Sequence, residues 1–226
     1  MTAHRAREMR PANAPANQAR PAGPSRAGVR LIRLHAASRR VPAATAAIAA
    51  SAIGLRIALI GHWDSYGALQ LPLVFEGACA AAIAITTASA LGEAERAGGR
   101  WLPILRLASA LALTAVAIAA LAAAGYGAHL AGGMLEVVRN VAGITGIGLL
   151  CAAALGGGLA WVGPAGYLVA GAYALYTQWH GPALTTPWMW PARPPHDVGA
   201  AICAGLVFTA GIAVITIRGA RDRLGE

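Results

Sequence analysis

Three charged side chains, Arg56, Glu76 and Arg106, fall inside long apolar blocks of this sequence, where a charge is costly unless it has a partner. Arg106 lies about one turn inside its block, and we predict that it snorkels to the inner interface. Arg56 lies ten residues before Tyr66, and Glu76 lies ten residues after it. If Tyr66 is near the tip of a hairpin of two helices, both charges lie at the same depth on adjacent antiparallel helices. We therefore predict either an intramembrane pair between Arg56 and Glu76 or outward snorkelling of the charged ends. The functional alternative is that the two side chains line a polar transport path.

A second cluster of charges follows the second apolar block. The segment LGEAERAGGRWLPILRL carries Glu93, Glu95, Arg96 and Arg100. This pattern is typical either of a solvated turn or of a short helix that docks onto a partner protein.

Imidazole and carboxylate groups together can bind metal ions or sense pH. Several of them fall in the loops predicted on the outer side, but they come from three different loops. No ligand spacing such as HExxH is present. We therefore predict no metal site and no cofactor, and we interpret these residues as solvated loop side chains. They are His62, Asp64, His129, Glu136, His180, His196 and Asp197.

The sequence carries no recognised catalytic signature, so we do not expect an enzyme. It has no Walker A motif, no GxSxG elbow and no dinucleotide-binding fingerprint. The glycines at 156–158 lack the preceding strand of a phosphate-binding loop, and we interpret them as close packing or a helix break. Cys79, Cys151 and Cys203 form no CxxC pair and fall inside apolar blocks, which favours a packing role.

The composition indicates that membrane helices must position these side chains. Of the 226 residues, 57% are hydrophobic and 12% are charged, about half the charged fraction of a soluble domain. The mean hydropathy is +0.56. Such a chain is too apolar to be disordered over most of its length. Its net charge of +9 comes from 18 Arg and no Lys against 9 acids, and the uneven distribution of the Arg residues argues against a nucleic-acid partner.

The apolar residues lie in blocks, and a helix that crosses a bilayer needs about 20 such residues. Six blocks predict an all-α, polytopic membrane protein. Their Ala and Gly residues favour close helix–helix contact. The fifth is the weakest span, because glycines and a proline obscure its start; it could begin near Leu159, or form a half-span or a broken helix. The six predicted spans are Val41–Gly61, Leu71–Gly92, Pro103–Gly125, Val141–Trp161, Pro164–Gln178 and Val198–Ile217.

The Arg residues predict the orientation, since cytoplasmic flanks carry an excess of Lys and Arg. Nine Arg residues lie in the first forty positions, two follow the second span and three follow the last. Six spans bring these three regions to one side. We therefore predict a multi-pass protein of the inner, cytoplasmic membrane with both termini in the cytoplasm.

The same pattern divides the chain into four parts. We predict a disordered cytoplasmic tail over residues 1–27, a six-span domain over 41–217 and a cytoplasmic tail over 218–226. Residues 28–40 are either a solvated basic flank or a short interfacial helix. All six Trp residues lie at or just beyond predicted span ends, as expected of interfacial anchors. The Pro- and Trp-rich segment 178–197 is predicted to pack over the outer mouth as a cap.

This layout resembles the small six-span permease subunits of ABC-type exporters, especially those of actinobacteria. The resemblance covers about residues 28–223. It rests on the basic flank, the EAERAGGRWLPILRL turn, the RNVAGITGIGLL opening of the fourth span and the Trp- and Pro-rich outer loop. It implies an elbow helix over residues 28–40 and a coupling helix over residues 92–100. In that helix Glu93, Glu95, Arg96 and Arg100 would transmit motion from the ATPase.

The resemblance implies two membrane subunits and two ATP-binding subunits. We therefore expect an exporter permease for a small or amphipathic substrate, which forms a homo- or heterodimer among membrane lipids. The first alternative is a stand-alone membrane protein for self-immunity or envelope stress, without an ATPase. A secondary transporter is a third option, but proton-coupled transporters usually carry acids deeper in the membrane than the predicted depth of Glu76.

Overall fold

The computed structural model describes residues 40–60, 67–87, 102–128, 133–177 and 186–220, together with Ala37. The chain divides into Met1–Leu34 and His35–Glu226, and all described residues belong to the second unit. The described residues form helices and short turns and contain no strand, so the predicted all-α class is confirmed. The predicted tail over residues 1–27, most of the flank over 28–40 and the last six residues lie outside the described ranges.

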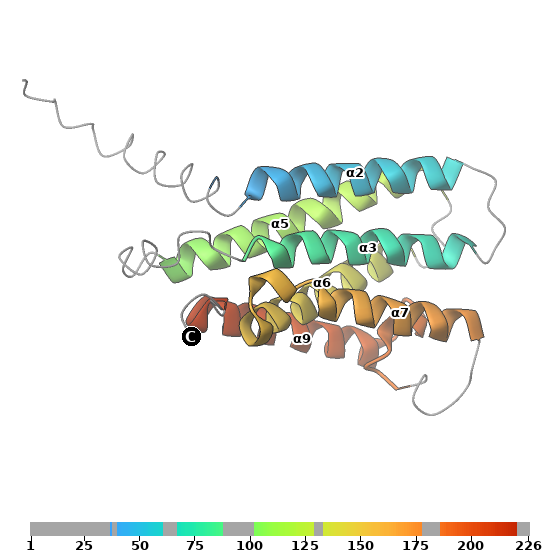
Figure 1. The fold of residues 1–226 in the computed structure, drawn as a ribbon. Helices are drawn as coiled ribbons and strands as arrows, with labels where there is room; N and C mark the ends of the chain where they lie inside the picture. Colours follow the sequence, from blue (N-terminus) through green and yellow to red (C-terminus); the bar gives the residue numbers. More distant parts are fainter. Residues whose placement is uncertain are drawn as a thin grey trace, which may run out of the picture. The chain divides into compact units, whose positions relative to one another are not determined.

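Six α-helices make up this bundle (Figure 1). The predicted limits of the first, third and sixth spans are correct to within a residue, because each span is a long and mostly apolar run. The helices are α2 (Val41–Ile60), α3 (Gly67–Ile85), α5 (Leu102–Gly125), α6 (Gly133–Leu155), α7 (Val162–Thr177) and α9 (Val198–Arg218), with short 3-10 turns η2 (Gly157–Leu159) and η3 (Trp190–Ala192).

The chain is a multi-pass membrane protein by the length and composition of its helices. Five stretches are long and apolar enough to cross a bilayer, and the fifth predicted span is one of them, as the 19-residue stretch Gly157–Leu175. This stretch has the lowest mean hydropathy of the five, as expected of the span predicted to be the weakest. A further apolar stretch, Leu71–Ile85 of α3, is shorter than these five, counted over the residues whose side chains the structure describes. The whole of α3 has 19 residues, or about 28 Å, which is close to the thickness of a hydrocarbon core of about 30 Å.

Glycine and proline explain the border between α6 and α7. Gly156 follows the last residue of α6 with φ 92°, a left-handed conformation that glycine adopts without steric cost. Its N–H donates to the carbonyl of Ala152 at 3.1 Å, which closes the last turn of the helix. Pro164 then lies in the first turn of α7, where a proline has no hydrogen bond to lose.

The core is built around α6, which packs on α3, α5, α7 and α9. In its apolar stretch 61% of the residues are buried, against 17% in α2 and 22% in α9. The backbones of α6 and α9 approach each other closely: a Cβ added to Gly211 would lie 2.6 Å from the carbonyl oxygen of Gly146. The expectation that small residues allow close helix contact is confirmed here.

Contacts at the helix ends show that α2 and α5 run in the same direction and that α9 runs in the opposite direction. Arg56 near the end of α2 reaches the carbonyl of Ala124 at the end of α5. Arg106 near the start of α5 lies beside Gly219, just after α9. A Cβ added to Gly219 would lie 2.7 Å from Nη1 of Arg106. The starts of α2 and α5 and the end of α9 therefore belong to one end of the bundle.

Candidate functional site

Arg56 and Glu76 do not form the predicted pair, and each has another partner. Nη1 of Arg56 donates to the carbonyl of Tyr126 at 2.8 Å and to that of Ala124 at 3.3 Å. The last carbonyls of a helix lack intrahelical donors and carry partial negative charge, so the end of α5 satisfies this guanidinium. Because Arg56 is exposed on the side of the bundle, its side chain extends toward a helix end rather than into the core.

Glu76 is instead buried in the centre of the bundle, with 1% of its surface exposed. It lies nine positions from each end of α3, or about 14 Å along the axis, so it is deeper in its helix than the predicted span Leu71–Gly92 placed it. Asn140 of α6, also 1% exposed, donates from Nδ2 to Oε2 of Glu76 at 2.9 Å. Leu73 and Ala80, one turn to either side of Glu76 on α3, belong to a buried apolar cluster with α6. The hydrogen bond is therefore enclosed by apolar side chains.

Asn140 reaches Glu76 because α6 begins at Gly133, eight residues before the predicted start of the fourth span at Val141. Glu136 and Arg139 therefore belong to a helix, and the prediction that Glu136 is a solvated outer-loop residue is wrong. A carboxylate in the first turn is favourable because the N-terminal end of a helix carries partial positive charge. The predicted span starts only at Val141 because hydropathy alone excludes the polar residues Arg139 and Asn140 that precede it.

The sequence did contain a signal for this longer helix. Val137, Val141 and Ile144 are spaced four and three residues apart, all are buried, and they place one face of α6 against the core. Asn140 lies on the same face, three residues from Val137 and four from Ile144. The repeat begins upstream of Val141, so helical periodicity identifies the buried face that mean hydropathy missed.

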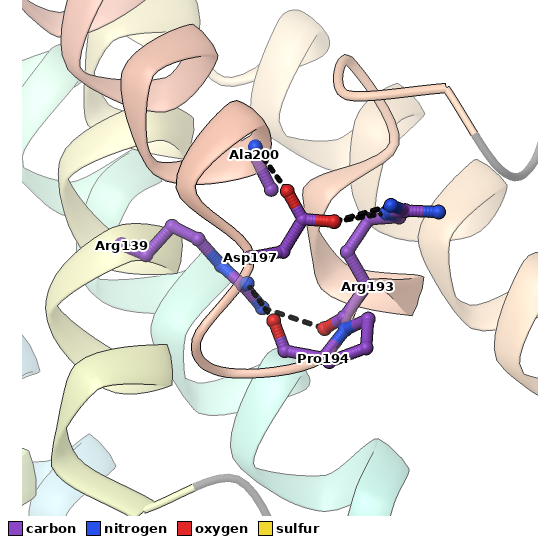
Figure 2. A network of polar contacts seen from close by, with 5 residues as sticks. All are labelled: Arg139, Arg193, Pro194, Asp197 and Ala200. Atoms are coloured by element: carbon purple, nitrogen blue, oxygen red, sulfur yellow. Dashed lines mark hydrogen bonds and ion pairs between the residues drawn. The ribbon is translucent and has the colours of Figure 1, made fainter.

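Arg139 faces the segment that precedes α9, as Figure 2 shows. Only 5% of its surface is exposed, and its guanidinium donates from Nη1 to the carbonyl of Pro194 at 2.8 Å and from Nη2 to that of Arg193 at 3.1 Å. Two backbone acceptors thus hold the cation. The interaction fixes the loop before α9 to the start of α6.

The same segment caps α9 (Figure 2). Oδ1 of Asp197 accepts the backbone N–H of Ala200 at 2.9 Å, and its Oδ2 accepts Nε of Arg193 at 2.7 Å and pairs with Nη2 of the same guanidinium. The hydrogen bond from Ala200, followed by that from Arg193, holds the pKa of Asp197 below its usual range. Asp197 is therefore a helix cap rather than a free loop carboxylate.

Trp190 is part of the core, and its predicted role as an interfacial anchor is wrong. It is 2% exposed, and its ring centroid lies 4.6 Å from that of Tyr167 on α7. Gly143 of α6 makes room for it, because an added Cβ would lie 2.5 Å from Cζ2 of the indole. Trp188, by contrast, is 49% exposed. The Tyr167 hydroxyl donates to the carbonyl of Trp188 at 2.7 Å, which helps fix this segment over α6 and α7.

Several buried polar atoms have no hydrogen-bond partner among the described residues. Buried polar groups are normally satisfied, so such atoms point to strain, a functional role, or a bound water or ion. Two of them belong to the central hydrogen-bonded pair, and others lie on or beside α6. They include Oε1 of Glu76, Oδ1 of Asn140, Nε of Arg139, Oγ1 of Thr145 and Nε1 of Trp190.

The other predicted site residues lie mostly outside the described residues. This holds for Glu93, Glu95, Arg96 and Arg100 of the predicted coupling helix. It also holds for His62, Asp64, His129 and His180, whereas His196 is described and exposed. Within the described ranges, no group of three or more His, Cys, Asp or Glu residues is positioned to hold a metal ion.

No protein-family model, curated protein or solved structure matches this chain. The resemblance to ABC-type permeases therefore remains an expectation from the sequence. The site has its own chemistry: a carboxyl and an amide from two helices meet in the centre of an apolar bundle. An arginine and a tryptophan tie the neighbouring loop to the same helix. Such an arrangement can bind or transfer polar species inside a membrane.

Proposed function

We propose that this chain is a transport protein, and specifically the permease subunit of an ABC-type exporter that works with a separate ATP-binding subunit and a second permease subunit. The observation that carries transport is the burial of Glu76, Arg139 and Asn140 inside a bundle of apolar helices. Ionisable and amide side chains are rare within spanning helices and commonly mark a substrate or ion pathway. The ATPase partner and the direction of export come from the sequence resemblance.

The proposed orientation puts the start of α2 and the end of α9 on the cytoplasmic side of the cell membrane. The Arg-rich stretches adjoin these two helix ends, and the positive-inside rule favours the cytoplasm for them. The connection with Glu93, Glu95, Arg96 and Arg100 leaves the end of α3 and enters the start of α5, which belong to the same side. This side is where a cytoplasmic ATPase would dock.

Co-purification with an ABC-type ATP-binding subunit, sought first among the products of the neighbouring genes, tests the proposal. We expect the ATPase to remain bound to the full-length chain in detergent or nanodiscs. The double variant Glu95→Ala/Arg96→Ala should lower coupled ATPase activity about tenfold or more, because it removes two of the four charged side chains of the proposed docking helix.

The matched control is Asp222→Ala/Arg223→Ala, which removes one acid and one Arg from the C-terminal tail on the same proposed side. It should leave binding and coupled activity unchanged. Equal activity of both double variants would overturn the coupling role of the loop. The absence of any ATPase partner would favour a stand-alone membrane protein instead.

A further inference from the structure

The carboxyl group of Glu76 has too few donors for a buried anion. An ionised carboxylate offers two oxygens and about four acceptor positions, all of which water would fill outside the protein. Glu76 is 1% exposed and receives a single hydrogen bond, from Nδ2 of Asn140 to Oε2 at 2.9 Å. Its Oε1 is buried and has no hydrogen-bond partner among the described residues. Desolvation of this kind strongly disfavours a negative charge.

The charges near Glu76 act on it in opposite directions, and none donates a hydrogen bond to its carboxyl group. The positive charge of Arg139 favours an ionised Glu76, but its guanidinium donates to the carbonyls of Arg193 and Pro194 instead. Glu136 of α6 is a second carboxyl that acts on Glu76, and its charge is of the same sign. Arg56 of α2 is bound to the end of α5.

The remaining titratable groups near the site are neutral under ordinary conditions. Cys79 lies three residues from Glu76 on α3 and is buried. Tyr167 of α7 packs against the adjoining apolar cluster, and its hydroxyl donates to the carbonyl of Trp188. In α5, α7 and α9, the described Arg, Asp and Glu residues are only Arg106 and Arg218, and both lie near the opposite end of the bundle from Arg139.

We propose that Glu76 is a proton-binding site in the middle of the membrane domain, where its carboxyl carries a proton while Asn140 donates to its other oxygen. The proton comes from water. It turns Oε1, an acceptor that no group donates to, into a hydroxyl that can itself donate a hydrogen bond. It removes the buried negative charge and leaves one O–H and one carbonyl oxygen, which a single amide can complement. Oδ1 of Asn140, a buried acceptor without a partner among the described residues, belongs to that amide.

A proton fits this site better than a metal cation does. Hard cations take about six or more oxygen ligands in proteins. The two buried oxygens without partners here are one from a carboxyl and one from an amide, and no metal-ligating cluster occurs in the described ranges.

Loss of the proton would leave a negative charge between α3 and α6. Either these helices would separate or water would enter, so proton release is coupled to their packing. This inference does not depend on the proposed ATPase partner. It differs from the expected Arg56–Glu76 pair, in which Glu76 would be ionised.

Infrared spectroscopy of the full-length protein in lipid vesicles at neutral pH tests the inference. A protonated carboxyl has a C=O stretching band that an ionised carboxylate lacks. We expect this band in the spectrum of the wild type minus that of Glu76→Gln. The matched control is Glu136→Gln, whose spectrum should retain the band. A difference spectrum of Glu76→Gln that contains only carboxylate bands would overturn the proposal.

A second variant keeps the test decisive if Glu76→Gln fails to fold. Asn140→Leu has a similar volume but removes the donor to Oε2. The C=O band of a protonated Glu76 should then move to higher frequency, because its carbonyl oxygen loses a hydrogen bond. A band that stays in place in Asn140→Leu would belong to another carboxyl and would overturn the assignment.

Discussion

Two consecutive residues of α6 connect different parts of the molecule. Successive side chains on an α-helix point about 100° apart, so neighbours in the chain face different partners. Asn140 faces α3 and bonds to Glu76, whereas Arg139 binds the carbonyls before α9. Both side chains are almost completely buried, so each partner is fixed by the cost of leaving a polar group unsatisfied. The first two turns of α6 therefore hold the bundle and the loop together.

At the same scale, the pKa of Asp197 predicts a pH dependence. Because Ala200 and Arg193 hold that pKa below its usual value near about 3.9, the ionised cap stabilises the fold above that value. This stabilisation is lost as the pH falls through the lowered pKa of the folded state. We expect Asp197→Ala to lower the thermal unfolding temperature at neutral pH, and the difference from the wild type to shrink in strong acid.

Arg193→Gln serves as the companion to that measurement. This variant leaves the hydrogen bond from Ala200 but removes the positive charge beside Asp197. The pH range over which the cap loses its stabilising effect should therefore move up toward the ordinary pKa of an aspartate. A difference between wild type and Asp197→Ala that does not change with pH would contradict a role for the ionised cap.

At the scale of the helices, the sequence predicts the limits of mostly apolar spans well, but not those of a span whose first turns carry polar residues. The limits of α2, α5 and α9 follow from long apolar runs between Arg- or Pro-containing segments. The start of α6 was missed because Arg139 and Asn140 are satisfied by tertiary partners that hydropathy does not register. The close contact of α6 with α9 was expected only in general terms, since the glycines that make it lie on different helices.

The crossing of α6 and α9 predicts a strong effect of one methyl group. A Cβ at Gly211 would lie 2.6 Å from the carbonyl oxygen of Gly146, so Gly211→Ala should push the helices apart. We expect it to lower the stability by about 1 to 3 kcal/mol, the usual cost of overpacking a core. Thermal unfolding in nanodiscs measures this change.

The control for that experiment is Gly205→Ala on the same helix. An added Cβ at Gly205 meets nothing within 4 Å, and alanine has the higher helix propensity. Its unfolding temperature should equal or exceed that of the wild type. A similar loss in both variants would show that helix packing at Gly211 is not the cause.

At the scale of the whole molecule, the fold class followed from the sequence, but the site followed only in part. Composition and block length sufficed for an all-α polytopic protein. Glu76 was identified as a buried charge, yet its partner was not, because the pairing with Asn140 depends on how α3 and α6 pack. Equal spacing from Tyr66 suggested Arg56, whereas the end of α5 offers that guanidinium better acceptors.

The proposed orientation predicts opposite labelling of two positions that flank α9. In a background without the native cysteines, Ala192→Cys should react with a membrane-impermeant maleimide on intact cells. Ala220→Cys should react only after permeabilisation, because it lies at the other end of the helix. Equal labelling of both positions from outside would refute this topology.

The central position of α6 also has a consequence for biosynthesis. During translation α3 is made before α6, so Glu76 is already present when Asn140 enters the bilayer. The carbonyls of Arg193 and Pro194, which hold Arg139, are made only after α7. A buried arginine is costly to insert without acceptors. We therefore expect the nascent chain to keep the first turns of α6 near the membrane surface until α9 has been synthesised, so that final insertion of α6 is a late step of maturation.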